Sequence, residues 1–267
     1  MTLRIGALLP TSTPDPARPF LGDVRAAARL AEQGGLDSVW APDHLIASAP
    51  ILDSTVALAV AAAVTERIGL GYGVLLLGLR PPAWAAKAVS SLQYVSGDRL
   101  LLGVGTGNPA HGDLGWRAAE QSFADRGRRT DASLRVLPDL IAGRAATLSD
   151  GTVATLSPGA TVPPILVAGD GPRARRRAAE FADGWLGIGQ TPEQVRQARA
   201  ELAALAAEFG RPTPSITIVV PPAGAVRETA DQLAEYTAAG VERVLLAPCD
   251  QNWPGYLEFA AEVRAAM

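Results

Sequence analysis

The chain has 267 residues, which is long enough for one large domain or two small ones with a substantial hydrophobic core. Hydrophobic residues make up 48% of it and the formal net charge is −3, a balance that is typical of globular proteins and argues against nucleic acid as a general partner. Cys249 is the only cysteine, which excludes an intrachain disulfide and leaves no basis for a cysteine–histidine zinc site. The N-terminal segment lacks the apolar core of a signal peptide, and the longest apolar run, 56–64, is too short to span a bilayer. We therefore expect a cytoplasmic protein without a membrane partner.

Short β-branched or leucine-rich runs alternate with longer alanine-rich amphipathic runs, so that each predicted strand precedes one helix. The predicted strands are residues 4–9, 38–41, 68–76, 100–105, 165–168, 184–188, 216–220 and 243–247. The predicted helices are residues 22–33, 54–65, 83–94, 124–140, 173–181, 193–209, 229–239 and 256–266. Thr191, Pro192 and Gln194 have the spacing of a capping box with proline at the first helical position.

The predicted strands are mostly apolar, as expected when helices cover both faces of a parallel sheet. Eight such β–α units in this length predict a single (β/α)8 barrel, or TIM barrel, over residues 1–267, with an open doubly wound sheet as the alternative. Residues 145–163 interrupt the alternation. Because Asp150 and Gly151 form a hairpin-type pair, this segment predicts a short β excursion before the fifth strand.

Both histidines fall after predicted strands, where the loops that build the active site of such a barrel begin. Asp43 and His44 follow the second strand, and His111 follows the fourth. An imidazole exchanges a proton near neutral pH, so His44 is a candidate acid–base group. In the alternative interpretation, Asp43 forms a turn and His44 is an ordinary surface residue.

Three glycines, Gly69, Gly71 and Gly73, stand at alternate positions of the third predicted strand. Glycine weakens a strand and often marks the close approach of a ligand or of another backbone. Two interpretations stay open: a ligand at the strand end, or tight internal packing. The fourth strand is also glycine-rich, but Asn108 stands where a dinucleotide motif needs its third glycine, so a Rossmann-type nicotinamide site is not expected.

Gly171 and Pro172 open a helix directly after the fifth predicted strand. Free backbone N–H groups and the positive end of the helix dipole would then face the catalytic rim and bind an anion such as phosphate. In the alternative interpretation Arg173, Arg176 and Arg177 form a solvated helix face. No metalloprotease, nucleophile-elbow or P-loop motif is present, which leaves a site where a cofactor does the difficult chemistry.

Taken in order, several short motifs of the chain resemble the bacterial luciferase-like superfamily of flavin and deazaflavin oxidoreductases. They lie at residues 38–40, 43–44, 73–75, 79–82, 87, 96–99, 102–105, 126–131, 171–172 and 182–185. The resemblance implies a (β/α)8 barrel that binds coenzyme F420 (8-hydroxy-5-deazaflavin) or FMN and a small-molecule substrate, usually as a homodimer. It also implies a non-proline cis peptide between Gly73 and Val74, behind the isoalloxazine ring.

The resemblance also implies roles for individual residues. Asp43 would touch the ring edge, His44 would donate a proton or contact the substrate, and the segment from Asp170 to Arg173 would bind the phosphate. The implied catalytic residues are His44 and Asn108, and the implied cofactor-binding residues are Asp43, Gly73, Val74, Leu75, Leu76, Thr106, Gly107, His111, Gly169, Asp170, Gly171 and Arg173.

Two positions depart from the family pattern. Deazaflavin sugar-phosphate dehydrogenases of the family carry a glutamate where this chain has Asn108, which cannot accept a proton as a carboxylate does. Many members have Arg-His-Pro where this chain has Arg80, Pro81 and Pro82. Three hypotheses follow: an F420-dependent oxidoreductase that transfers a hydride, an FMN-dependent monooxygenase that uses dioxygen, and a flavin-binding barrel without catalysis.

Overall fold

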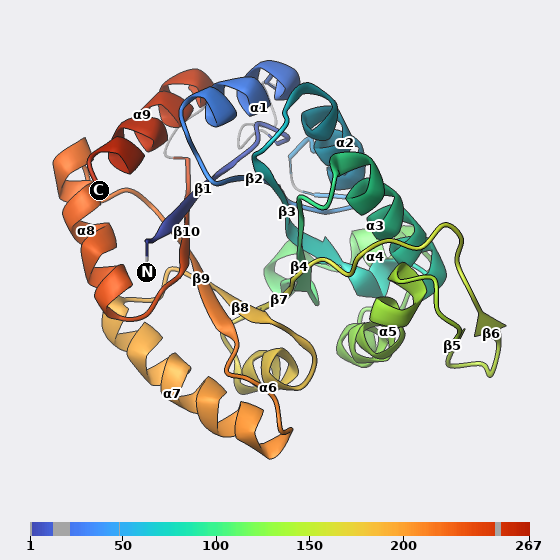
Figure 1. Ribbon diagram of the computed structural model, residues 1–267. Helices are drawn as coiled ribbons and strands as arrows, with labels where there is room; N and C mark the ends of the chain where they lie inside the picture. The colour runs from blue at the N-terminus through green and yellow to red at the C-terminus, as the bar shows by residue number, and fades with distance from the viewer. Residues whose placement is uncertain (1, 13–21, 48, 249–251) are drawn as a thin grey trace.

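The computed structural model describes residues 2–12, 22–47, 49–248 and 252–267, and its centre is a closed barrel of parallel strands (Figure 1). Its strands are β1 (Arg4–Leu8), β2 (Ser38–Ala41), β3 (Gly69–Leu76), β4 (Leu100–Gly105), β7 (Ile165–Ala168), β8 (Gly184–Ile188), β9 (Ser215–Val220) and β10 (Arg243–Leu246). Because β1 pairs with both β2 and β10, the sheet has no edge. The (β/α)8 barrel is confirmed, and the alternative of an open sheet is wrong.

Helices surround the barrel, and each predicted helix is present with ends that differ by a few residues. They are α1 (Val24–Gln33), α2 (Ser54–Val64), α3 (Pro82–Ser96), α5 (Arg126–Ile141), α6 (Pro172–Phe181), α7 (Pro192–Glu208), α8 (Val226–Ala238) and α9 (Trp253–Ala265). The capping box that begins α7 is confirmed, because the Thr191 hydroxyl accepts from the Gln194 N–H and the Gln194 side chain accepts from the Thr191 N–H.

Three short helical segments follow strands and were not predicted. They are η1 (Leu77–Leu79), η2 (Pro109–His111) and α4 (Leu114–Ala118). The predicted excursion before the fifth barrel strand is confirmed as an antiparallel pair, β5 (Ala146–Thr147) and β6 (Val153–Ala154), which projects beyond the helices. Gly151 in its turn has a φ of 87°, the left-handed conformation that favours glycine.

Trp40 fills the middle of the barrel. Its fully buried indole packs with Leu166, Leu186 and Leu245, which also point inward. Gly71 makes room for this ring: a Cβ atom on Gly71 would lie 2.1 Å from Cδ2 of Trp40. Internal packing therefore accounts for glycine at position 71 of β3.

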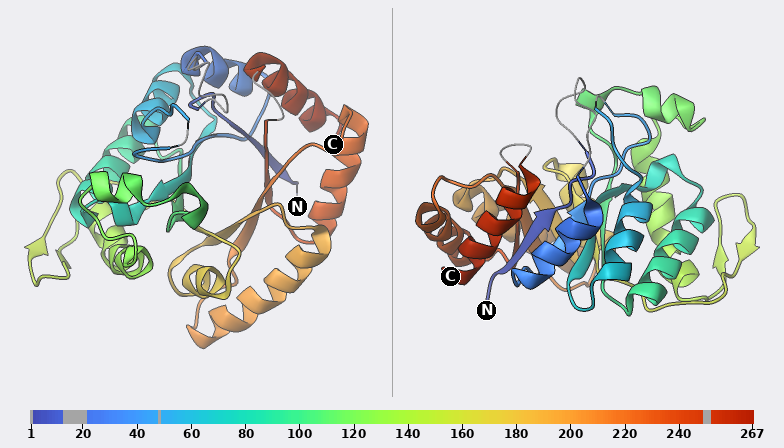
Figure 2. Two further views of the ribbon diagram at one scale, coloured as in Figure 1. Left: turned by 180° about the vertical axis from the view of Figure 1, so that it is seen from behind. Right: turned by 90° about the horizontal axis from the view of Figure 1, so that it is seen from above.

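The two ends of the barrel differ. All eight barrel strands run in the same direction, so their carboxyl ends form one rim, where α4 lies (right-hand view of Figure 2). The predicted strand end at Cys249 and Asp250 lies outside the described residues. In the part of the chain that the structure describes, no helix has the length and apolar character that crossing a membrane requires.

Candidate active site

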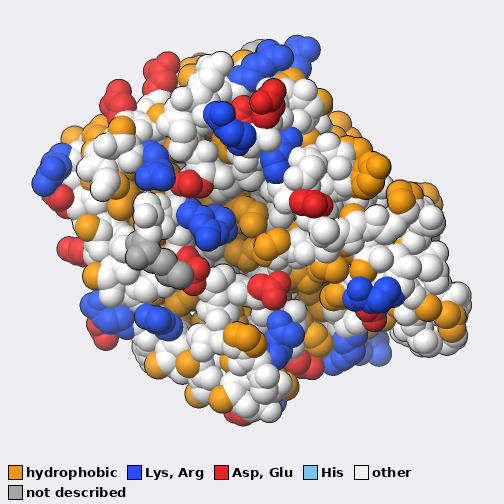
Figure 3. Space-filling view, in the orientation of Figure 1, with side chains coloured by type: hydrophobic (Ala, Val, Ile, Leu, Met, Phe, Trp, Pro, Cys, Tyr) orange, Lys and Arg blue, Asp and Glu red, His pale blue; other side chains and the backbone are white. Residues whose placement is uncertain are grey.

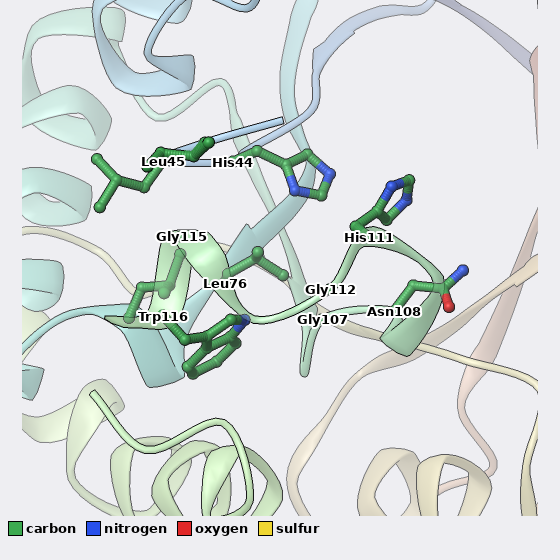
Figure 4. Close-up of a pocket in the computed structure, with 11 residues that line it drawn as sticks. His44, Leu45, Leu76, Gly107, Asn108, His111, Gly112, Gly115 and Trp116 are labelled. Atoms are coloured by element: carbon green, nitrogen blue, oxygen red, sulfur yellow. The ribbon is translucent and has the colours of Figure 1, made fainter. Parts of the chain in front are cut away.

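The two histidines meet at the rim. Their rings make an edge-to-face contact with centroids 4.9 Å apart, although His44 follows β2 and His111 ends η2 (Figure 4). Both line one pocket at the carboxyl end of the barrel. The remaining residues of this pocket are Leu45, Ile46, Leu76, Leu79, Gly107, Asn108, Gly112, Gly115 and Trp116. Among the described residues that line it, none carries a fixed charge, so this part of the pocket joins an apolar wall to two imidazoles and one amide.

Asp43 lies behind this pocket and is only 2% exposed. Both of its carboxylate oxygens accept hydrogen bonds from Arg80, at 2.6 and 2.7 Å, and one also accepts from the backbone N–H of Leu76 at 2.9 Å. A buried carboxylate needs such a partner. The pair ties the end of β2 to the end of β3, and it thereby fixes the backbone that carries His44.

The half-buried His44 imidazole has a pKa below its ordinary value of 6.5. Burial is the main cause, the charge of His111 acts in the same direction, and Asp43 opposes both. The neutral ring is therefore favoured at neutral pH. A neutral imidazole that faces a pocket can accept a proton from a substrate hydroxyl.

The strand ends beside the pocket contain the predicted cis peptide between Gly73 and Val74, which is confirmed. Val74 packs against both the barrel interior and the cluster of Leu76, Leu79 and Trp116. Leu75 instead packs into the core beneath the helices, away from the pocket.

The loop after β4 carries four of the predicted site residues. Thr106 is partly buried, and Gly107 has a φ of 84° and lies against the ring of Trp116. Asn108 is exposed and caps the beginning of η2. Its side-chain oxygen accepts a hydrogen bond from the backbone N–H of Ala110. The amide therefore has a local structural role besides lining the pocket.

The N-terminus of α6 has no side-chain cap, in contrast to α1, α2 and α7. Gly171 occupies the cap position, and nothing lies within 4 Å of where its Cβ would be. Arg173 beside it is exposed and makes no ion pair within the described residues. An anion can therefore reach the free N–H groups of this turn.

The other arginines of α6 have partners. Arg175 binds Glu201 at 2.8 Å, Arg176 binds Glu208 at 2.9 Å, and Arg177 binds Asp131. Arg176 and Arg177 therefore belong to a helix face whose charges are paired within the protein. Arg173 has no such partner among the described residues and is available to bind an anion.

Gly169 and Asp170 complete the predicted anion loop. The Gly169 carbonyl accepts a hydrogen bond from the Trp185 indole at 2.7 Å. The Asp170 carboxylate accepts from the Gln190 amide at 2.6 Å, and both residues line a second pocket with Arg175 and Glu201. The Asp170 side chain is thus directed towards α7, and the structure does not bring it together with the histidines.

The pocket also contains residues that sequence reasoning did not assign to the site. They include Leu45 and Ile46, which lie in the loop after β2. The partner of Asp43 was missed as well, because Arg80 stands 37 residues further along the chain and only the barrel brings them together. Among the described residues, no group of three or more His, Cys, Asp or Glu side chains could hold a metal ion.

This rim and barrel match a known family. The family model described as luciferase-like monooxygenase covers residues 3–266, so the chain belongs to the luciferase-like monooxygenase family.

Two relatives of this chain come from Mycobacterium tuberculosis. An uncharacterized protein is 35% identical over 170 residues, which are 62% of this chain and 58% of that protein. An F420-dependent hydroxymycolic acid dehydrogenase is 29% identical over 280 residues, covering 95% of this chain and 75% of the relative. The chain thus spans little more than half the length of the first of these relatives.

Solved structures share the fold. An F420-dependent secondary alcohol dehydrogenase in complex with an F420–acetone adduct superposes with a TM-score of 0.83 at 16% identity, over 98% of each chain. An EDTA monooxygenase from Chelativorans superposes with a TM-score of 0.80 at 14% identity, over 99% of this chain and 93% of the other. The chain is therefore similar both to F420-dependent enzymes and to a monooxygenase.

Proposed function

We propose that this protein is an F420-dependent oxidoreductase that transfers a hydride between the deazaflavin and a small, uncharged organic substrate. The observation that carries the proposal is the rim pocket in which the half-buried His44 meets His111 beside Leu76 and Trp116. The similarity to F420-dependent relatives along most of the chain favours the deazaflavin over FMN.

The residues present fit such a cofactor. The uncapped N-terminus of α6, with Gly171 and Arg173, offers backbone N–H groups and a cation to a phosphate. Gly73 and Gly107 provide positions without a side chain at the ends of two neighbouring strands. The bound cofactor would supply the hydride chemistry itself.

The chain's own residues would orient the substrate and handle the proton. The imidazole of His44 would take the proton from a substrate hydroxyl during oxidation or return it to a carbonyl oxygen during reduction. The Asp43–Arg80 pair would hold the backbone of His44 in position, and Trp116 with the leucines would exclude water. Asn108 would donate a hydrogen bond to the substrate rather than move a proton.

An FMN-dependent monooxygenase is the second candidate, and the likeness to a monooxygenase structure favours it. We test the two by titrating the purified protein with F420 and, separately, with FMN, following fluorescence. The proposal expects selective binding of F420 with a dissociation constant at or below about 1 μM. Selective binding of FMN would replace the proposal with oxygen chemistry, and binding of neither would remove the cofactor assignment.

A flavin-binding barrel without catalysis is the third candidate. For the His44→Ala variant we expect an unchanged dissociation constant for the cofactor and a fall in turnover of about 100-fold or more, the usual contribution of an acid–base group. Reduction of F420 by a panel of small alcohols is the assay. Wild-type protein that binds F420 tightly and turns over none of them, with His44→Ala indistinguishable from it, would support the non-catalytic candidate.

A homodimer in the cytoplasm is part of the proposal. Support for a dimer comes from the outer face of α2 and α3: α2 carries no charged residue, and Val56 and Trp84 expose 63% and 73% of their surface.

A further inference from the structure

Arg243 lies inside the barrel at the end opposite the rim. It is the first residue of β10, and Leu245, two positions later on the same face of the strand, packs against Trp40. The guanidinium carbon of Arg243 lies 5.9 Å from the centre of the Trp40 ring. The side chain therefore points inward, below the indole that fills the middle of the barrel.

Apart from its cation–π contact with the Trp40 ring, this buried arginine has no hydrogen-bond or ion-pair partner among the described residues. Only 8% of it is exposed, its Nε atom has no hydrogen-bond partner, and no carboxylate of the described residues lies within ion-pair distance. Burial, together with the charge of Arg4, lowers the pKa of Arg243 to about 10, which still leaves it charged at neutral pH. A buried, unpaired charge is costly, so a missing counter-ion is the simplest account of it.

The surrounding residues do not neutralise it. Arg4 on β1 and Thr217 on β9 stand directly beside Arg243 in the strand ladder. Asp37 and Glu242 favour the charged form from a distance, but Asp37 is occupied by the Ile5 N–H and by Arg264. Two cations and a hydroxyl therefore share one end of the barrel, and no carboxylate in the described part of the chain contacts the buried cation.

We propose that the amino-terminal end of the barrel binds a small oxyanion, with inorganic phosphate as its model ligand, on the guanidinium of Arg243. The planar guanidinium presents two parallel N–H donors that match two oxygens of a phosphate. Arg4 supplies a second cation at the entrance, and the buried Thr217 hydroxyl supplies a further donor from the adjacent strand. Figure 3 looks at this end and shows Lys or Arg side chains at the edge of a central apolar hollow.

The site is separate from the cofactor phosphate loop, because Gly171 and Arg173 follow the carboxyl end of β7 whereas Arg243 begins β10. Trp40 and its leucine neighbours fill the barrel between the two ends. A phosphate bound at Arg243 therefore cannot be the phosphate of a cofactor on the rim.

The test is calorimetric titration of the full chain with sodium phosphate, with sodium chloride at equal ionic strength as the reference. The rim loop at Gly171 and Arg173 can also take phosphate in the apoprotein, so we expect saturable binding that persists in the Arg173→Gln variant. Arg243→Met should weaken the affinity at least about tenfold, as expected for the loss of a charge-assisted pair, and Thr217→Val should weaken it about threefold. Arg227→Gln, at an exposed position on α8 that pairs only with Asp231, is the control for net charge and should bind as the wild type does.

Arg173→Gln distinguishes the two ends of the barrel. Loss of phosphate binding in Arg173→Gln, with binding kept in Arg243→Met, would place the anion on the rim and overturn the proposal. Absence of saturable binding by the wild type would also overturn it. If Arg243→Met does not fold, the test depends on Arg4→Gln and Thr217→Val. Both variants must bind phosphate more weakly than the wild type does, without any change in the sodium chloride reference titration.

Discussion

At the scale of single residues, the contact between His44 and His111 has the clearest chemical consequence. The charge of His111 opposes a proton on His44, because the two ring centroids are 4.9 Å apart and His44 is half-buried. The charge of Arg80 is paired with Asp43. His111 is therefore the neighbour whose change should alter the proton affinity of His44 most directly.

This contact predicts the pH dependence of substrate oxidation. Because the pKa of His44 is depressed, the neutral base should prevail at pH 7, and kcat/KM should fall only as the pH drops below 6.5. The His111→Gln variant loses the opposing charge, so the midpoint of this fall should move to higher pH. A midpoint that stays fixed or moves to lower pH would contradict the prediction.

At the same scale, the sequence was enough to place both histidines on the rim, because each lies in the loop that follows an apolar strand. It could not show that they touch, nor that Arg80 neutralises Asp43. Those contacts join residues far apart in the chain, and no local pattern encodes them. The roles of Asn108, Thr106 and the other proposed cofactor-binding residues stay predictions.

At the scale of elements, Gly71 of β3 has a packing cause that can be measured. In the Gly71→Ala variant the added Cβ would fall 2.1 to 2.5 Å from three atoms of the Trp40 indole, inside a barrel that cannot expand locally. We expect a loss of about 3 kcal/mol in the free energy of unfolding, measured by urea denaturation.

Two variants control this experiment. Gly171→Ala adds the same methyl group where nothing lies within 4 Å, and it should leave the stability of the apoprotein nearly unchanged. In a Trp40→Leu background, Gly71→Ala should cost much less than in the wild type, since the clashing ring is gone. Equal costs in both backgrounds would show that Trp40 is not the reason for glycine at this position.

The long helices and the barrel strands could be predicted from the sequence, whereas the short helical segments could not. The apolar runs of the barrel strands and the periodic helices extend over enough residues for their pattern to be recognised. Segments η2 and α4 contain about one turn each, so no periodicity can appear in them, and their position depends on contacts such as Trp116 with Gly78 and Gly107. This limit affects the site directly, because both segments line the pocket.

At the scale of the whole molecule, the outer face of α2 and α3, where Val56 and Trp84 are exposed, predicts the proposed homodimer. Trp84 projects from this face and is 73% exposed, which is unusual for a large aromatic side chain on a monomer. Trp84→Glu should weaken dimerisation at least about tenfold, as measured by sedimentation velocity over a range of concentrations. Wild-type protein that sediments as a monomer at micromolar concentration would refute the prediction.

The closure of the barrel is a property of the whole chain that the strand order alone did not establish. The pairing of β1 with β10 joins residues near the two ends of the chain, such as Arg4 and Arg243. The same alternation of strands and helices is compatible with an open sheet, so only the number of units favoured closure.

The indole of Trp40 also determines how solvent reaches the chemistry. Because this ring and its leucine neighbours fill the middle of the barrel, no open channel connects its two ends. In the proposed reaction, a proton that His44 gives up or receives would therefore enter and leave on the carboxyl side of the barrel. A substrate and a cofactor that together covered the rim would block this path. The site would then exchange no proton with the solvent until one of them left.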